Sequence, residues 1–456
     1  MSEHISAALI SRRTLLRGGA AAAAAVPLAS CATWAAAAEA TRRPRRTGIA
    51  NVRVSHDHYG VHIEPSVAAN PRNRRHLLAA CQASPTANPE FIATYLSFDG
   101  GASWHNGGLP QLPAGHRKQG DDVTVAFDAH GRGYVCASSG SHAAGSDVYV
   151  WRTDDGGRSF SAPVSLRAGQ YHDHPGVATG QGQTPSEHNV YAVWAAGSGT
   201  TALGFTRSTD GGQSFEPPRT ILPESSVPSM DSAGPELAAG PHGLVCAACY
   251  WTTQAHRSGD TIGQAVAVCS TDGGHSFAAP VELGSGASDI HLPGDVRPNS
   301  SPTVAATPNG YLYVAFPKHQ PGAKHSSIVV VESSDGGRNW PKEVTATPDD
   351  GVTYFQPNLA VTNDGRVAVS AFALANGRVN QVLIVSQPQG LRFRPPLQVT
   401  TTAFDPHSPT VNPKHGAWWI GDYQGITAGA AGAFHLVWND TRTGKLELFA
   451  ATVATE

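Results

Sequence analysis

One eight-residue pattern recurs along the chain and constrains its fold more than any other feature. It begins with Ser or Thr, carries Asp-Gly-Gly in its middle and ends in an aromatic residue. Asp and Ser side chains bond backbone N–H groups within turns, and glycine supplies positive φ. The pattern is therefore typical of a β-hairpin turn whose aromatic residue packs onto the sheet. Five segments, called the Asp-Gly-Gly turns below, carry it: Ser97–Trp104, Thr153–Phe160, Ser208–Phe215, Ser270–Phe277 and Ser333–Trp340.

A second motif, Pro-x-apolar-Ala in most copies, precedes each turn. Another turn and an apolar strand follow it, so each unit of about 50–65 residues predicts four antiparallel strands. A sixth, degenerate copy of the turn, Ser386–Phe393, retains the Ser, one Gly and the aromatic residue but lacks the Asp. One such sheet cannot bury both faces alone, whereas neighbours stacked in a ring can. The copies begin at Pro65, Val123, Pro175, Pro235, Pro302 and Pro357.

The Asp-Gly-Gly turns resemble the Asp boxes of sialidases and related β-propellers, and the resemblance covers residues 50–456. It implies an all-β propeller of four-stranded blades, six in number for a sialidase. The units favour seven blades, because six are followed by a seventh with three strands, beginning near Trp418–Ile426. The segment Ile49–Ser55 is available to supply its fourth strand and close the ring. Six blades remain the alternative.

The N-terminus predicts export. Ser11–Leu16 resembles a twin-arginine signal, and the Ala-rich stretch after it is too short for a permanent membrane helix. We therefore expect residues 1–40 to be a signal segment, 41–48 a basic linker and 49–456 a single propeller domain.

The fate of the exported chain has two alternatives. Leu28–Cys31 resembles a lipobox, which makes Cys31 a candidate lipidation site that would anchor the protein to the outer face of the cytoplasmic membrane. Cleavage near Ala38–Ala40 would instead release a soluble secreted protein.

Charge and cysteine content exclude several classes of partner and site. The net charge is −3 with no basic stripe, so nucleic acid is not an expected partner, and we expect a monomer. Five cysteines follow Cys31, and an odd number excludes complete pairing. Cys246 and Cys249 are three positions apart in an apolar strand and so point to opposite faces, which favours buried thiols over a zinc site.

Candidate site residues come from the inner strands of the expected blades. Acids in the Asp-Gly-Gly turns are occupied by backbone, whereas residues just before Pro-x-apolar-Ala should ring the entrance of the central channel. Acids that converge there must raise a pKa, pair with a base or bind a cation. The expected ring consists of Glu64, Asp121, Asp122, Asp173, His174, Gly234, Ser300, Ser301, Phe355, Gln356, Asp422 and Tyr423.

A divalent metal is one expectation for this ring. His172, Asp173 and His174 place two imidazoles around a carboxylate, which is compatible with a transition metal, and oxygen-rich Ca²⁺ coordination is equally compatible. Solvated loop histidines are the alternative, since the chain has 21 histidines. No cofactor is certain from the sequence.

The sialidase resemblance assigns roles. It implies a carboxylate clamp of three arginines, a Tyr nucleophile paired with Glu, and an Asp acid/base. The family's early Arg-Ile-Pro motif is absent, and Val52–Val54 is its nearest substitute. The candidates are Arg53, Arg297 and Arg442 for the clamp; Tyr354 or Tyr423 as nucleophile; Glu64 or Glu236 as its partner; Asp121, Asp122 or Asp173 as acid; and His174, Gln356 and Asp422 as further substrate contacts.

These features favour an extracytoplasmic, sialidase-like glycoside hydrolase acting on glycans, with a polysaccharide lyase using His and Tyr as a variant. The alternative is a non-catalytic propeller that binds glycans or proteins at the cell surface, since a fold does not determine a function. The positions of Arg53, Arg297 and Arg442 test the sialidase-like interpretation, because a carboxylate substrate requires their guanidinium groups to converge in one pocket.

Overall fold

The computed structural model describes residues 48–456 with gaps. The gaps are 86–90, 112–118, 140–146, 170–171, 183–187, 197–201, 223–233, 253–260, 285–287, 291, 293, 298–299, 320–324, 389, 408–417 and 456. At 119–121, 251–252, 261–262 and 288–290 only the backbone is described. The predicted signal segment, Cys31 and nearly all of the linker lie outside the described residues. The chain divides into Met1–Arg43 and Pro44–Glu456, and everything below concerns the second unit.

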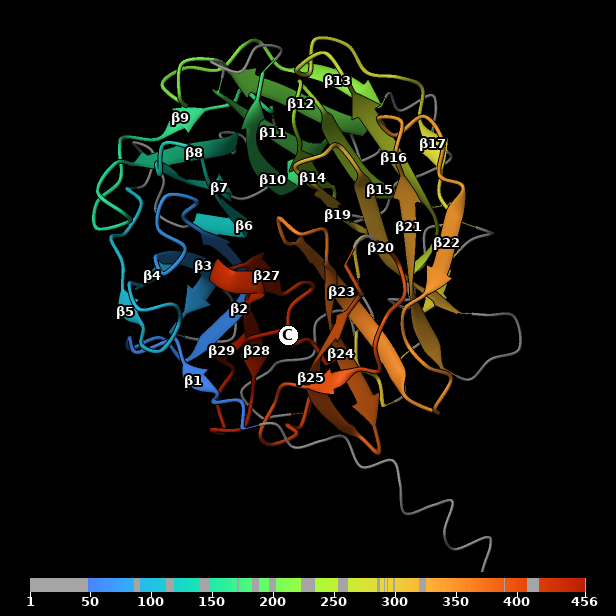
Figure 1. Ribbon diagram of the computed structural model, residues 1–456. Coiled ribbons are helices and arrows are strands. Elements are labelled where there is room, and N and C mark those ends of the chain that lie inside the picture. The colour runs from blue at the N-terminus through green and yellow to red at the C-terminus, as the bar shows by residue number, and fades with distance from the viewer. Residues whose placement is uncertain are drawn as a thin grey trace, which may run out of the picture. The chain divides into compact units, whose positions relative to one another are not determined.

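The described strands form seven antiparallel sheets, each following one four-strand path (Figure 1). Blade one consists of β2(Val61–Ala69), β3(Leu77–Ser84), β4(Phe91–Ser97) and β5(His105–Asn106), blade two of β6(Gln119–Phe127), β7(Gly133–Ser139), β8(Asp147–Thr153) and β9(Val164–Ser165), and blade three of β10(His172–Gln181), β11(His188–Ala196), β12(Ala202–Ser208) and β13(Arg219–Leu222). Blade four consists of β14(Glu236–Ala239), β15(Val245–Thr252), β16(Thr261–Ser270) and β17(Val281–Glu282), with β18(Ser288–Ile290) also paired to β16, and blade five of β19(Thr303–Ala306), β20(Leu312–His319), β21(Ser326–Ser333) and β22(Lys342–Thr345). Blade six consists of β23(Thr353–Val361), β24(Val367–Ala375), β25(Arg378–Val385) and β26(Leu397–Gln398), and blade seven of β27(Gly425–Ala428), β28(Phe434–Asp440), β29(Glu447–Val453) and β1(Val52–Arg53).

The seventh blade closes the ring with a strand from the other end of the domain. β1 pairs antiparallel with β29, with Val52 opposite Ala450 and Arg53 opposite Phe449. This is the closure that the segment Ile49–Ser55 predicts. The seven-bladed propeller is confirmed, and the six-bladed alternative is wrong.

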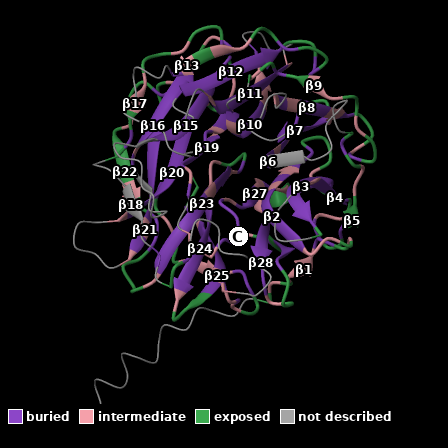
Figure 2. Ribbon diagram, turned by 180° about the vertical axis from the view of Figure 1, so that it is seen from behind, coloured by how far each residue is buried: buried purple, intermediate pink, exposed green. Residues whose placement is uncertain are grey.

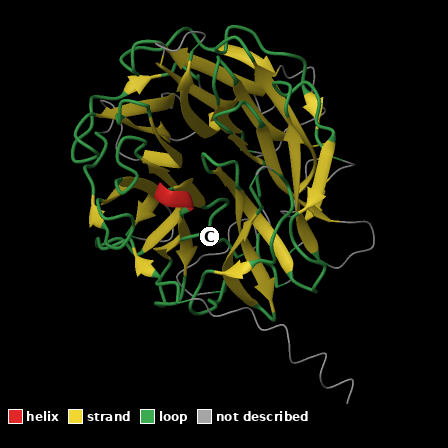
Figure 3. Ribbon diagram, viewed as in Figure 1, coloured by secondary structure: helices red, strands yellow, loops and turns green. Residues whose placement is uncertain are grey.

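The core lies between neighbouring blades, because each sheet has two apolar faces. One cluster joins Cys246 and Tyr250 of blade four to Val314 and Phe316 of blade five, all at most 1% exposed. Figure 2 shows the same distribution, with buried strands through the blades and exposed residues in the turns at the rim. Figure 3 shows strands and loops with one short helical turn, η2(Ala430–Gly432). Within the described part of the chain, no helix has the length and apolar character to cross a membrane.

Hydroxyl groups on the inner strands bond adjacent blades to one another. The x position of Pro-x-apolar-Ala supplies Ser66, Thr124 and Thr303, whose oxygens accept hydrogen bonds from the backbone N–H groups of Val125, Val177 and Leu359 at 3.1, 3.0 and 3.3 Å. Each bond runs to the next blade. At the same position β10 carries Gly176, β23 carries Asn358 and β14 carries Glu236, which lines the channel.

The Asp-Gly-Gly turns connect the third and fourth strands of their blades. In the third, the hydroxyl of Ser208 donates to Asp210 Oδ1 at 2.7 Å, and the N–H of Ser214 donates to the same oxygen at 3.0 Å. These donors hold the pKa of Asp210 below its usual value against the opposing effect of partial burial. The acids of these turns are therefore occupied by local hydrogen bonds.

One cysteine prediction is wrong and the others are confirmed. Cys246 is not a free thiol, because it forms a disulfide with Cys269, the residue directly opposite it in the β15–β16 pair. The sequence spacing directs attention to Cys249, whereas the strand register selects Cys269. Cys81, Cys136 and Cys249 are buried thiols.

Candidate functional site

Four inner strands reach the channel mouth in an unusual backbone conformation. Glu64, Asp122, His174 and Gln356 have φ values of 56°, 51°, 46° and 47°, in the left-handed region that non-glycine residues rarely adopt. Each lies at a β-bulge in the pairing of the first and second strands of its blade. Such conformations cost of order 1–3 kcal/mol each and concentrate at functional sites. Here they turn polar residues of four blades toward the mouth.

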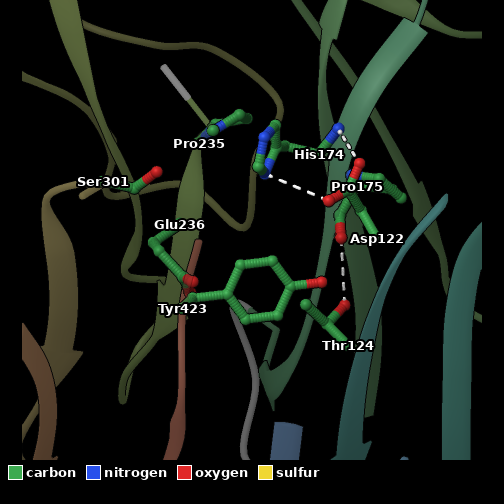
Figure 4. A pocket seen from close by; sticks show the side chains of 9 residues that line it. Asp122, Thr124, His174, Pro175, Pro235, Glu236, Ser301 and Tyr423 are labelled. Atoms are coloured by element: carbon green, nitrogen blue, oxygen red, sulfur yellow. Dashed lines mark hydrogen bonds and ion pairs between the residues drawn. The ribbon is translucent and has the colours of Figure 1, made fainter. Parts of the chain in front are cut away.

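His174 and Asp122 form an ion pair at the mouth (Figure 4). His174 Nδ1 lies 3.4 Å from Asp122 Oδ1, and the His174 backbone N–H donates to Asp122 Oδ2 at 3.3 Å. Burial by itself lowers the pKa of His174, but the carboxylates of Asp122, Asp173 and Asp422 outweigh it, so the pKa is raised. The acids thus favour the imidazolium form.

Glycine at position 234 leaves room for the imidazole. A Cβ atom there would lie 2.5 Å from His174 Nδ1 and 2.6 Å from His174 Cγ, closer than non-bonded atoms approach. Any side chain at Gly234 would therefore displace the ring from Asp122.

Tyr423 lies beside His174, with ring centroids 6.1 Å apart. Its hydroxyl oxygen accepts a hydrogen bond from the Val123 N–H at 2.9 Å. Burial, together with the negative charges of Asp122 and Glu64, raises the pKa of Tyr423 well above its usual value. The phenol is therefore protonated and fixed in position at neutral pH.

Glu236 faces the same pocket from β14 (Figure 4). Burial raises the pKa of Glu236 to about 7, while the positive charge of His174 acts in the opposite direction. Among the residues that the structure describes, its carboxyl group makes no hydrogen bond, in contrast to the acids of the Asp-Gly-Gly turns. Glu236 is therefore a carboxyl group that exchanges a proton near neutral pH.

A second set of polar contacts borders this group. Arg297 Nη2 lies 3.0 Å from Asp422 Oδ2, and the Trp419 indole N–H donates to Asp422 Oδ1 at 2.9 Å. The Asp422 backbone N–H donates to Glu64 Oε1 at 3.2 Å, and Gln82 donates to the other carboxylate oxygen of Glu64. Sequence reasoning missed Trp419, although its place three residues before Asp422 is a usable signal.

Three side chains at the mouth could hold a metal ion. Asp122, Asp173 and His174 offer ligand atoms that all lie within 4.8 Å of one another. His172 is not in this group, because it is buried with Nδ1 3.3 Å from the Ser138 hydroxyl. Metal binding would require neutral His174, whereas the surrounding acids favour its protonated form.

The structure brings some of the predicted residues together and separates others. Glu64, Asp122, Asp173, His174, Glu236, Gln356, Asp422, Tyr423 and Arg297 gather at or beside the mouth. Tyr354 lies instead in the apolar core between blades five and six, where its hydroxyl donates to Asp350. The side chain of Asp121 lies outside the described residues.

The three arginines do not converge. Arg53 pairs with Glu447 at 2.5 Å, and Arg442 pairs with Asp440 at 2.5 Å, so both are bound to buried acids of the β28–β29 hairpin. Only Arg297 joins the mouth. The carboxylate clamp implied by the sialidase resemblance is therefore not assembled in this structure.

No protein-family model matches the chain, and no curated protein matches it in sequence. Solved structures match its fold. A protein of unknown function from Dyadobacter fermentans is 12% identical, with a TM-score of 0.50 over 89% of this chain and 98% of that chain. An ulvan lyase is 12% identical, with a TM-score of 0.50 over 86% and 94%. A leech intramolecular trans-sialidase is 14% identical, with a TM-score of 0.47 over 71% and 67%.

The fold is a β-propeller of seven four-stranded antiparallel blades. The propeller fold expected from the Asp-Gly-Gly turns is thereby confirmed. At these identities the likeness to the solved structures extends to the arrangement of the blades and not to individual site residues. The chemistry of this propeller depends on the residues at its own channel mouth.

Proposed function

We propose that the protein is a glycan-cleaving enzyme and that the mouth is its catalytic site. One observation carries the proposal: His174 and Glu236 face one pocket, and their surroundings raise the pKa of both, that of Glu236 to about 7. Acid–base catalysis is most effective when the pKa of the catalytic group lies near the working pH. In this site imidazolium His174 donates a proton and ionised Glu236 accepts one.

A glycan substrate is supported by the fold. The ulvan lyase of similar fold acts on a polysaccharide, which makes polymeric carbohydrate the substrate class to test first. Sialic acid is not the substrate that we propose, because Arg297 alone represents the three-arginine clamp and already pairs with Asp422.

A panel of polysaccharides and oligosaccharides tests the proposal. Wild-type protein should release reducing ends from at least one substrate, and Glu236→Gln and His174→Asn should each reduce kcat/KM by about 10²–10⁴-fold. Glu282→Gln and His105→Asn, at exposed positions of outer strands, are matched controls and should retain activity. Binding without cleavage of any glycan would support a non-catalytic propeller instead.

The pH dependence gives a second test. The rate requires Glu236 ionised, so kcat/KM should fall as pH drops below about 7, and it requires His174 protonated, so kcat/KM should fall again on the alkaline side. The expected pH profile is therefore bell-shaped. In the pH profile of the residual activity of Glu236→Gln, the fall on the acidic side should be absent and the fall on the alkaline side should remain. An unchanged fall on the acidic side would mean that another group accepts the proton.

We further propose that the enzyme works outside the cytoplasm. The twin-arginine pattern at Arg12 and Arg13 supports this location. Replacing both arginines by lysine should retain uncleaved protein in the cytoplasmic fraction. Labelling with a fatty-acid analogue, compared with Cys31→Ser, separates a lipid-anchored from a secreted product.

A further inference from the structure

Residues 420–424, called the mouth segment below, carry Asp422 and Tyr423 but belong to no strand. The first strand of blade seven, β27, begins only at Gly425. Backbone N–H and C=O groups that are buried outside a sheet need other hydrogen-bond partners. The position of the mouth segment therefore depends on side chains that bond to its backbone.

Three consecutive residues of the mouth segment are bonded to side chains from three blades. Gln356 Nε2, from blade six, donates to the Gly421 carbonyl at 2.7 Å. Asn439 of blade seven donates to the carbonyl of the residue before at 2.6 Å, and Glu64 of blade one accepts from the N–H of the residue after at 3.2 Å. A carbonyl oxygen only accepts, so each amide must present its nitrogen to the segment.

Gln356 contacts the mouth segment on both sides of the two mouth residues. Its side chain bonds to Gly421, and its backbone carbonyl accepts a hydrogen bond from Gln424 Nε2 at 2.8 Å. Asp422 and Tyr423 are the two residues between these points. Gln356 therefore brackets both of them, which no other residue does in the described part of the chain.

The conformation of Gln356 is costly and its side chain is inaccessible. Its φ of 47° is left-handed, and its Oε1 atom is buried with no hydrogen-bond partner among the described residues. Both features lower the stability of the folded protein. The sequence favours Gln356 as a substrate contact, but a side chain that is only 1% exposed is not accessible to a glycan. Its bonds to the mouth segment give it a different role.

Gly421 brings the mouth segment close to its neighbours. Its φ is 92°, and a Cβ atom there would lie 2.7 Å from Asn439 Nδ2 and 3.1 Å from the Glu64 backbone nitrogen. The Gly421 backbone is thus packed between blades one and seven. The bond from Gln356 fixes it from the third side.

The two bracketed residues complete the mouth. Asp422 Oδ2 lies 3.0 Å from Arg297 Nη2, and Tyr423 lines the pocket that His174 and Glu236 face. A shift of the mouth segment would move the partner of Arg297 and a wall of this pocket together.

We propose that Gln356 is a positioning residue, which holds the mouth segment so that Asp422 and Tyr423 keep their places at the mouth. It touches no substrate and acts only through these two residues. Its effect on the reaction rests on the proposed function, whereas its effect on the mouth segment does not.

The effect on the segment can be tested without activity. Gln356→Met keeps the length of the side chain and removes its amide. Gln381→Met is the matched control, because Gln381 is also in blade six, is 0% exposed and has an Oε1 atom without a partner among the described residues. The readout is the NMR signal of the Trp419 indole N–H, which donates to Asp422 and is assigned with Trp419→Phe. It should shift in Gln356→Met and stay in place in Gln381→Met; an unmoved signal in folded Gln356→Met overturns the proposal.

Kinetics tests the consequence for the reaction. On the substrate found by the panel, Gln356→Met should lower kcat about 10–100-fold with KM within about threefold, because the residue orients groups and binds no substrate. Gln381→Met should stay within about twofold of wild type in both. An unchanged kcat, or a loss confined to KM, overturns the proposal and leaves glycan cleavage standing. Wild-type protein that cleaves no glycan overturns the proposed function, and the Trp419 signal still decides whether Gln356 holds the segment.

A second variant decides the question if Gln356→Met does not fold. Gln424→Met removes only the bond to the Gln356 carbonyl, at the other end of the bracket. It should shift the Trp419 signal and lower kcat in the same direction. A wild-type signal together with a wild-type kcat in Gln424→Met overturns the proposal.

Discussion

The carboxylates of the Asp-Gly-Gly turns and that of Glu236 behave in opposite ways. Asp99, Asp155 and Asp272 are at the rim, yet local hydroxyl and N–H donors lower the pKa of each to about 2. Glu236 lies in the channel, where burial raises its pKa to about 7, and it lacks such donors. Burial and the availability of hydrogen-bond donors therefore together decide whether an acid of this propeller stabilises a turn or exchanges protons.

The largest difference in kcat/KM should appear when one carboxylate is removed at the mouth and one in an Asp-Gly-Gly turn. Asp122→Asn should lower kcat/KM by about 100-fold, because the carboxylate that favours imidazolium His174 is lost. Asp210→Asn, the matched change in an Asp-Gly-Gly turn, should stay within about twofold of wild type. Kinetics at neutral pH compares the two variants. Similar losses in both would erase the distinction between the regions.

A smaller effect should follow from displacing His174 without changing any charge. Gly234→Ala places a methyl group against the ring and should lower kcat/KM by about tenfold. Gly390→Ala is the control, because its Cβ has no neighbour within 4 Å. If Gly234→Ala matches Gly390→Ala in activity, the position of the imidazole does not matter for catalysis.

Stability should change in the opposite direction from activity at the mouth. The folded-state pKa of Glu236 is about 7 against an ordinary 4.5, so ionising it destabilises the folded protein above pH 7. Glu236→Gln should raise the free energy of unfolding at pH 8 by on the order of 1–2 kcal/mol, allowing for partial solvent screening. The gain should vanish as pH falls toward 4.5. Urea titrations at pH 5 and 8 check this, and a pH-independent change would contradict it.

The smallest expected change in the free energy of unfolding is at the rim. Asp155→Ala removes the acceptor for the hydroxyls of Thr153 and Ser159 and should cost about 0.5–1.5 kcal/mol. Because the folded-state pKa of Asp155 is lowered, its contribution is present above the ordinary pKa of 3.8 and is lost as pH falls through about 2. The same urea titrations at pH 7 and 3 measure it, and equal activity of variant and wild type confirms its structural role.

Local chemistry explains what the sequence could predict. Turn residues repeat because five blades share the same hairpin, and an incomplete last unit required the strand that Val52 and Arg53 supply. The mouth was also predictable, since the residues before Pro-x-apolar-Ala begin the inner strands. These properties depend on a few neighbouring residues.

The remaining features depend on contacts between distant residues. Nothing near Arg442 in sequence shows that Asn51 is its neighbour, yet its guanidinium donates to Asn51 Oδ1 at 3.0 Å. The pairing of Cys246 with Cys269 follows from strand register, and the raised pKa of Glu236 follows from burial and a lack of donors. Such properties require the packed ring.

The two-residue strand β1 has a consequence for synthesis. Its partner in β29 follows roughly 400 residues later, so the ring stays open until nearly the whole domain has left the ribosome. Until then Val52 and Arg53 have no partner strand. Joining the ends costs little more than a shorter loop would, because closure entropy grows only with the logarithm of length. A chain that stops before β29 therefore cannot close the ring with β1, whereas a completed chain can.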